Sequence, residues 1–346
     1  MPSPPAAPQP PAKPASDPRH LTHLIVPFAA CAGDAWQETM QPLCKAQLGH
    51  VSELLQGMVL LESFDGDAQS LSPPHERALA RAHGLDAAGL ADGLIPWAAW
   101  ERSQRTPPED TALKAWAFVT PCHWAFGREQ AILSDPEGLA LTEADSRTLM
   151  AAMQGYFEQD GIALSYGGPD HWLAEGAIFR QLPTASLDRA IGRSVDPWLP
   201  DGSAAKTLRR LQNEMQMLLY THPLNDLRQQ QGLVPVNTVW FSGTGDLPEG
   251  GRRPAATGPA QQVMAPRGLA RAMFTGDWAA YAAAWTALDA GAVQELLSRQ
   301  GAGQTVRLTL CGERSSRTWQ SGTGGLIARL SRRWSAKPLF DILETL

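Results

Sequence analysis

Three carboxylates stand where a sheet of parallel strands could place metal ligands. Asp34 and Glu313 each come shortly after an apolar run, and Asp277 precedes a segment with helical spacing. Two-metal phosphoryl chemistry needs several carboxylates and histidines that converge on ions roughly 4 Å apart. None of the eight histidines lies after residue 222, so the last part of the chain supplies only Asp, Glu and Cys. The three carboxylates predict an incomplete metal site, and Asp277 also suits the first position of a helix, where it would cap the free amides.

Two His-Trp steps, at His123 and at His171, suggest a different chemistry. The simpler interpretation is a packed aromatic ring beside a partly buried, hydrogen-bonded histidine. The functional alternative is an anionic pocket formed by His123, Arg128, His171 and Arg180. Arg suits such a pocket because its planar guanidinium can hold a carboxylate or phosphate with two hydrogen bonds. This alternative predicts a small phosphorylated or carboxylate ligand.

The segment HPLNDLRQQQGLVPVNTVWFSGTG, from His222 to Gly245, combines several structural signals. Pro223 ends one helix pattern, Gly232 permits a left-handed closing residue, and Val234 to Phe241 is an apolar run typical of a buried strand. A turn of small residues, Ser242 to Gly245, follows. Open α/β sheets place ligands beyond the carboxyl ends of parallel strands. The segment therefore predicts a ligand-binding turn.

Other common sites have no signature here. The glycine patterns of P-loop and Rossmann proteins and the G-x-S-x-G nucleophile elbow are absent. The four cysteines lie far apart without a CxxC pair, which argues against a disulfide framework or a zinc knuckle and favours a reducing, cytoplasmic setting. We expect Cys311 to be a small buried hydrophobe.

Composition excludes further classes. The 346 residues carry 29 Lys and Arg against 35 Asp and Glu, a net charge of −6, so nucleic-acid binding has little electrostatic support. No apolar run approaches the roughly 20 residues that cross a bilayer. Residues 1–18 are rich in proline and lack an apolar core, which predicts a disordered leader and not a signal peptide.

The elements that must position these residues predict an α/β protein. Apolar runs predict strands near 21–30, 261–265 and 305–310, and helical spacing predicts helices over 43–56 and 204–220. Between them, a strand, strand, helix, strand, strand order suggests a small α+β module. His75, after Pro73 and Pro74, is expected in a solvated helix start. The predicted division is a leader at 1–18, a core at 19–110 and 200–346, and an inserted module at 111–199.

The segment quoted above resembles part of the archaeal-type, cofactor-independent phosphoglycerate mutases, in which His-Pro-x-Asn and an Arg precede a strand ending in Gly-x-Gly. PPHERALARAHGL, TPCHW, LPTASLDRAIGR, LQNEMQMLLYTHP and LTLCGE are similar to a proteobacterial branch often labelled phosphoglycerate mutase or Rpf E-type regulatory protein. The resemblance implies an alkaline-phosphatase-like fold: a mostly parallel sheet flanked by helices and interrupted by a substrate-binding insertion. It also implies that Asn225, Arg228 and Ser242 border the substrate.

Active members of that family pass a phosphoryl group between the 2 and 3 hydroxyls of glycerate with two divalent metals and a serine. This chain departs from their pattern: Asp34 comes several residues late after the first strand, and Cys311, Gly312 and Glu313 replace an Asp-His pair. Ser242 stands where the mutases usually carry Arg.

Three interpretations stay open. The first is a degenerate mutase-like protein, without a metal cofactor, that acts as a regulatory or anionic-ligand-binding module. The second is an active phosphoglycerate mutase or related phosphatase that binds Mn or Zn through Asp34, Asp277 and Glu313. The third is an interaction protein that uses a Trp-rich surface.

Overall fold

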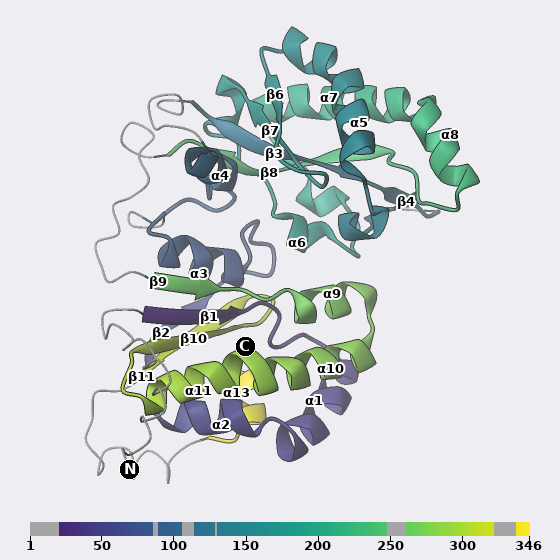
Figure 1. Cartoon of the computed structure of the whole chain (residues 1–346). Coiled ribbons are helices and arrows are strands. Elements are labelled where there is room, and N and C mark those ends of the chain that lie inside the picture. The colour runs from purple at the N-terminus through teal and green to yellow at the C-terminus, as the bar shows by residue number, and fades with distance from the viewer. Residues whose placement is uncertain (1–20, 86–88, 106–113, 129, 248–260, 322–336) are drawn as a thin grey trace, which may run out of the picture.

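The computed structural model describes residues 21–85, 89–105, 114–128, 130–247, 261–321 and 337–346 (Figure 1). The predicted leader at 1–18 lies outside these residues. Within the described ranges, no helix is both long and apolar enough to cross a membrane. All four cysteines are free thiols.

The larger sheet has five strands in the order β2, β11, β10, β1, β9. Strand β1 (Leu21–Val26) lies parallel to β10 (Val306–Cys311) on one side and to β9 (Gln261–Met264) on the other. Strand β11 (Ser315–Ser321) runs antiparallel to both β10 and the edge strand β2 (Met58–Asp65). Four strands therefore point the same way, which confirms the α/β class with a central, mainly parallel sheet.

Helices cover both faces of this sheet (Figure 1). Helix α3 (Pro74–Ala82) packs on one face. The other face is covered by α1 (Asp34–Ala46), α2 (Gly49–Gln56), α9 (Gly268–Thr275), α10 (Trp278–Leu288), α11 (Gln294–Gly301) and α13 (Leu339–Glu344). The helix predicted over 43–56 is thus two helices, interrupted between Ala46 and Gly49.

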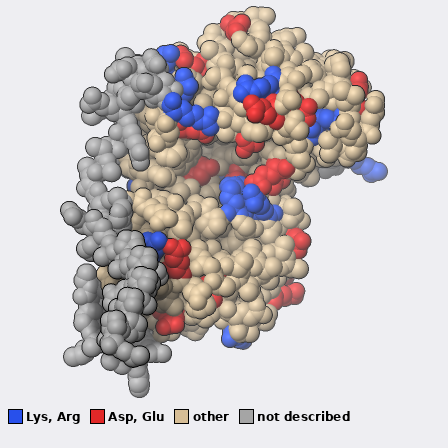
Figure 2. All heavy atoms as spheres, in the orientation of Figure 1, with Lys and Arg blue, Asp and Glu red and all other residues tan. Residues whose placement is uncertain are grey.

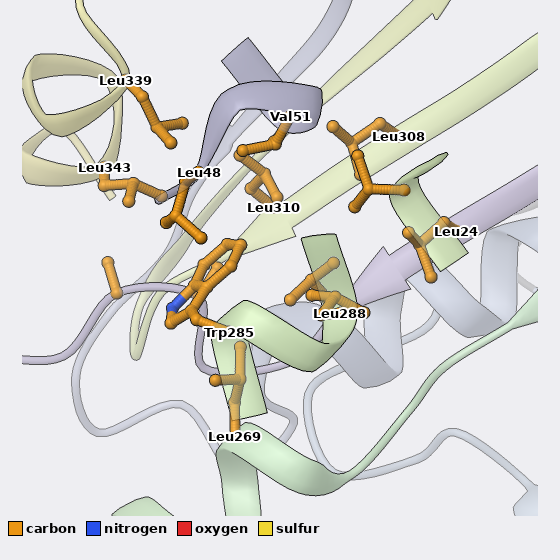
Figure 3. Packing of buried hydrophobic residues seen from close by; sticks show 14 of the residues in the cluster. Leu24, Leu48, Val51, Leu269, Trp285, Leu288, Leu308, Leu310, Leu339 and Leu343 are labelled. Carbon is orange, nitrogen blue, oxygen red and sulfur yellow. The ribbon is translucent and has the colours of Figure 1, made fainter. Parts of the chain in front are cut away.

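Alternation along β1 explains this two-sided cover. Leu24 joins the large core on the helix-rich face, whereas Ile25 packs with Ala78 of α3 on the other face. In the large core, Leu24 lies between Leu308 of β10 and Leu288 of α10 (Figure 3). A strand buried on both faces is expected to be apolar at consecutive positions, as Leu24 to Val26 are.

A second sheet is antiparallel and has four strands in the order β6, β7, β3, β8. Their bounds are Ala163–Tyr166, Trp172–Glu175, Trp116–Cys122 and Thr238–Gly245. Residues of α5 (Glu143–Gln159) and α7 (Ser203–Tyr220) form the core on one face, and α4 (Trp97–Arg105) packs on the other. The helix predicted over 204–220 is confirmed as α7, and β6 and β7 pair antiparallel as a hairpin. A short ribbon of β4 (Trp124–Phe126) and β5 (Ala131–Leu133) adjoins it.

Strand β8 corrects the prediction for Ser242 to Gly245. These residues are the end of β8 itself, and β8 pairs antiparallel with β3, so they do not form a turn after a parallel strand. The register shifts opposite Trp116 and Phe118, and Gly243 and Gly245 adopt φ angles of 61° and 135°. Glycine tolerates those angles, which lets the strand continue through the irregularity.

The division into core and inserted module stays a prediction. The two sheets group residues 200–245 differently from that division. Residues 200–245 were assigned to the core, whereas α7 packs against the second sheet and β8 is one of its strands. Pairing across more than 100 residues of sequence brings β8 beside β3.

Candidate functional site

The carboxyl end of β1 carries an aromatic side chain. Phe28 has a φ of 51°, an uncommon conformation for an aromatic residue. Its carbonyl accepts a hydrogen bond from the Tyr281 hydroxyl at 2.6 Å, and the next amide, of Ala29, donates to the Cys311 carbonyl at 2.7 Å. The Phe28 ring lies 5.2 Å from that of His75. The first strand end is thus apolar, and its strained backbone is held by hydrogen bonds.

The three predicted metal ligands are not grouped together among the described residues. Asp34 is exposed at the start of α1. Asp277 caps α10, accepting the Ala280 amide at 2.8 Å, which confirms the capping interpretation. Glu313 pairs with Arg193 at 2.7 Å. In the part of the chain that the structure describes, no three His, Cys, Asp or Glu side chains are grouped to hold an ion. This donor set does not fit a two-metal centre.

A cleft of about 430 Å³ opens between the two sheets. It is bounded by α3, by α4, by the start of α6 (Leu187–Ala190) and by β8. Figure 2 shows the surface hollowed here, with acidic side chains at the margin. Its volume is within the range of small-molecule sites.

Asp188 organises the floor of the cleft. Its Oδ2 lies 2.9 Å from Nε2 of His75, and Arg267 donates two hydrogen bonds to the carboxylate, at 2.9 and 2.7 Å. Burial opposes ionisation of Asp188, but the hydrogen bonds from His75 and Arg267 outweigh it and hold its pKa well below the usual range. His75 is buried, so the prediction of a solvated helix start was wrong. The cause is Asp188, which lies 113 positions away in the sequence.

Glu76 lies beside this network, and the pKa of its carboxyl group shifts in the direction opposite to that of Asp188. Its Oε1 accepts a hydrogen bond of 2.5 Å from the Ser186 hydroxyl. Burial of the carboxyl raises the pKa of Glu76. Glu76 and Asp188 are therefore neighbouring acids of opposite tendency: one favours the proton, the other the charge.

Two of the predicted ligand residues line the cleft: His171 and Ser242. His171 contacts Glu101 through Nε2 and Asp170 through Nδ1, each at 2.9 Å. Burial opposes protonation of His171, but these two carboxylates outweigh it and raise its pKa to about 9. The imidazolium charge at neutral pH is consequently already matched by carboxylates.

The other members of the predicted anionic pocket do not join His171. Nδ1 of His123 lies 2.9 Å from the Pro235 carbonyl, Arg180 pairs with Asp246 at 2.7 Å, and Arg128 is exposed. None of the three is among the residues that line the cleft. That these three residues bind a ligand stays a prediction, and they do not line the cleft together with His171.

Asn225 and Arg228 fix the chain around α8 (Pro223–Gln230) instead of lining the cleft. The Asn225 amide donates to the carbonyls of Leu219 and Val236 at 2.8 and 2.6 Å. Both side chains are buried. That they border a substrate, as the resemblance implies, stays a prediction that the lining of this cleft does not support.

A second cavity, of about 670 Å³, lies at the carboxyl ends of β1 and β10; we call it the arginine hollow. Arg189, Arg193 and Arg314 line it, together with the residues from Ala30 to Gly33 that lead into α1. Glu313 and Glu344 are the acidic residues of its lining. Cys31 also lies here, and burial raises the pKa of its thiol to about 12.

The arginine hollow is a functional candidate that the sequence analysis missed. Arg189 and Arg193 lie in the LPTASLDRAIGR segment, which served there as a family marker only. No helical spacing could have paired them, because α6 ends at Ala190 and Arg193 follows Gly192, which has a φ of 73°.

Comparison with known proteins adds a partial relationship. A segment of 125 residues is 29% identical to a probable 2,3-bisphosphoglycerate-independent phosphoglycerate mutase of Geobacter sulfurreducens. It spans 35% of this chain and 31% of that protein. Over this segment the chain is phosphoglycerate mutase-like. No family model matches the chain.

Solved structures give weaker likenesses. A Pyrococcus horikoshii protein aligns over 90% of this chain and 92% of its own, with 12% identity and a TM-score of 0.45. A cofactor-independent phosphoglycerate mutase from Thermoplasma acidophilum aligns over 95% and 98%, with 11% identity and a TM-score of 0.34. These scores are too low to carry an argument, and the Rpf E-type branch stays a prediction.

Proposed function

We propose that this protein is a mutase-like binding module that takes a small phosphorylated or carboxylate ligand and serves regulation instead of phosphoryl transfer. The observation that carries the proposal is the arginine hollow, where three guanidinium groups and a helix N-terminus line one cavity. Its place at the carboxyl ends of parallel strands is where α/β sheets bind ligands.

Arg189 supports an anionic ligand most directly. Arg189 is 3% exposed, and its Nη1 donates to the Glu313 carbonyl at 2.7 Å. Its Nε has no hydrogen-bond partner among the described residues. Burial lowers the pKa of Arg189, and the charge of Arg193 lowers it further. A bound anion would offset both effects, because it supplies negative charge and hydrogen-bond acceptors.

Helix α1 adds a second source of positive potential. Gly33 at its N-cap provides no side-chain hydrogen bond, so the first amides of a 13-residue helix lack a capping side chain. Such amides and the helix dipole favour anions. A side chain at Gly33 would stand over this approach, and φ of 105° there favours glycine.

A binding role fits the strand ends better than metal-dependent transfer does. The active family expects metal-binding carboxylates and a histidine there, and this chain offers Phe28 and Glu313, the latter paired with Arg193. Regulation is supported by the segment 186–193, which supplies Ser186 and Asp188 to the cleft and two arginines to the hollow. A ligand that shifts this segment would alter both cavities.

Thermal unfolding with 3-phosphoglycerate and with inorganic phosphate tests the proposal. Ligand at 100 times its Kd should stabilise the wild-type protein by about 2.7 kcal/mol and raise Tm. The Arg193→Gln variant should lose most of this rise. Arg210→Gln is the matched control, because Arg210 is an exposed residue of α7. Equal rises in both variants, or no rise in the wild type, would reject the arginine hollow as the site.

A further inference from the structure

The cleft has an electrostatic character opposite to that of the arginine hollow. Six carboxylates line it, belonging to Glu76, Glu101, Asp135, Glu137, Asp170 and Asp188. The cations of the lining, Arg267 and His171, are held by Asp188 and by Glu101 with Asp170. The existing cations are therefore already matched, and acidic groups remain.

Two carboxyl groups in the cleft have no ion pair among the described residues. Glu76 accepts the Ser186 hydroxyl, and Asp135 accepts the Glu137 amide at 3.0 Å. Burial raises the pKa of Glu76 and, with the nearby Glu137 charge, that of Asp135. The charge of Arg267 reaches both groups and opposes these shifts, but neither group forms an ion pair with it.

His75 supplies an independent sign of a missing ligand. It lines the cleft, it is 2% exposed, and its Nδ1 has no hydrogen-bond partner in the described structure. In the tautomer that donates from Nε2 to Asp188, Nδ1 can only accept. In that tautomer, a group with an N–H or O–H donor would satisfy it.

Aromatic rings form the opposite wall. Trp97 and Trp100 lie edge to face with centroids 5.8 Å apart, and Phe118 packs against His171. All three line the cleft, and the two tryptophans are half-buried. The faces of tryptophan rings attract organic cations, more strongly where water is excluded.

We propose that the cleft binds a small organic cation that carries N–H donors, such as an alkylammonium group. The ammonium hydrogens bind Glu76, Asp135 and the free nitrogen of His75, and the alkyl part lies against Trp97 and Trp100. An anionic ligand is disfavoured here because the acidic residues of the lining outnumber its cations. This site lies apart from the proposed anion site, and the two share only the segment 186–193.

Calorimetric titration of the full chain with n-butylammonium tests this inference. Saturable binding should be at least tenfold weaker for tetramethylammonium, which has no N–H donor, and absent for butyrate. Glu76→Gln should weaken n-butylammonium binding at least tenfold. Glu38→Gln, an exposed change on α1, should leave it unaltered.

Asp135→Asn is a second test that still applies if Glu76→Gln fails to fold. Asn keeps the capping hydrogen bond from the Glu137 amide, so this variant should fold. It should also weaken binding while melting as the wild type does. The inference is overturned if butyrate binds as well as n-butylammonium, if the wild type shows no saturable binding, or if Asp135→Asn binds like the wild type.

Discussion

Arg228 shows at the residue scale how a charged side chain can serve the fold. It is 1% exposed and donates to the Val234 and Leu139 carbonyls at 3.0 and 2.5 Å. Burial lowers the pKa of Arg228. The side chain therefore joins α8 to the loop before α5 and lines neither cavity.

Arg228→Ala should destabilise the protein by about 3 kcal/mol, since it removes charge-assisted bonds and leaves two buried carbonyls unpaired. Urea unfolding of this variant and of Arg210→Ala measures the difference. The exposed Arg210 should contribute much less, because solvent screens its ion pairs. Similar losses in the two variants would contradict the structural role of Arg228.

His171 predicts a pH dependence. Its pKa is raised from 6.5 to about 9, so the folded state binds the proton more tightly than the unfolded state. Its stabilising effect is complete below about pH 6.5 and is lost as pH rises through about 9. His171→Gln should therefore cost more stability near pH 6 than near pH 10. An equal loss of stability at both pH values would contradict the charge pairing of His171 with Glu101 and Asp170.

The sequence indicates some of these residues and not others. Asp277 as a helix cap follows from local pattern, because its partner is three residues away. The burial of His75 could not be predicted, because Asp188 and Arg267 reach it from distant parts of the chain. Arg189 is similar, since its contact with Glu313 depends on how the sheets pack.

At the scale of elements, β8 has a geometry that glycine makes possible. A Cβ at Gly243 would lie 2.9 Å from a ring carbon of Phe118, and the φ of 61° is unfavourable for other residues. This explains why a Ser-Gly-Thr-Gly sequence, which looks like a turn, continues as a strand. Helix α7 was predictable because its apolar residues recur at helical spacing within one segment. The pairing of β8 was not predictable, because its partner β3 lies far away in the sequence.

Gly243→Ala should destabilise the protein by about 1–3 kcal/mol through strain and the ring contact. Gly155→Ala is the matched control, because that exposed position in α5 has open space for a Cβ. It should stabilise by about 0.5–1 kcal/mol, as alanine favours a helix. Chemical denaturation measures both, and a neutral Gly243→Ala would contradict the strained geometry.

At the scale of the molecule, segment 186–193 separates two cavities of opposite charge. Asp188 belongs to the acidic cleft, and Arg189, the next residue, belongs to the arginine hollow. Apolar runs and helical spacing were enough to predict the α/β class. They could not predict the cavities, which form where the two sheets and their helices meet.

The central claim is anion binding without metal-dependent phosphoryl transfer. The most direct measurement is metal content of the purified protein together with turnover of 3-phosphoglycerate in added Mn²⁺, for the wild type and Asp34→Ala. The account predicts no stoichiometric metal and no turnover in either, with 3-phosphoglycerate still raising Tm in the presence of a chelator. Stoichiometric metal with turnover that Asp34→Ala abolishes would contradict it.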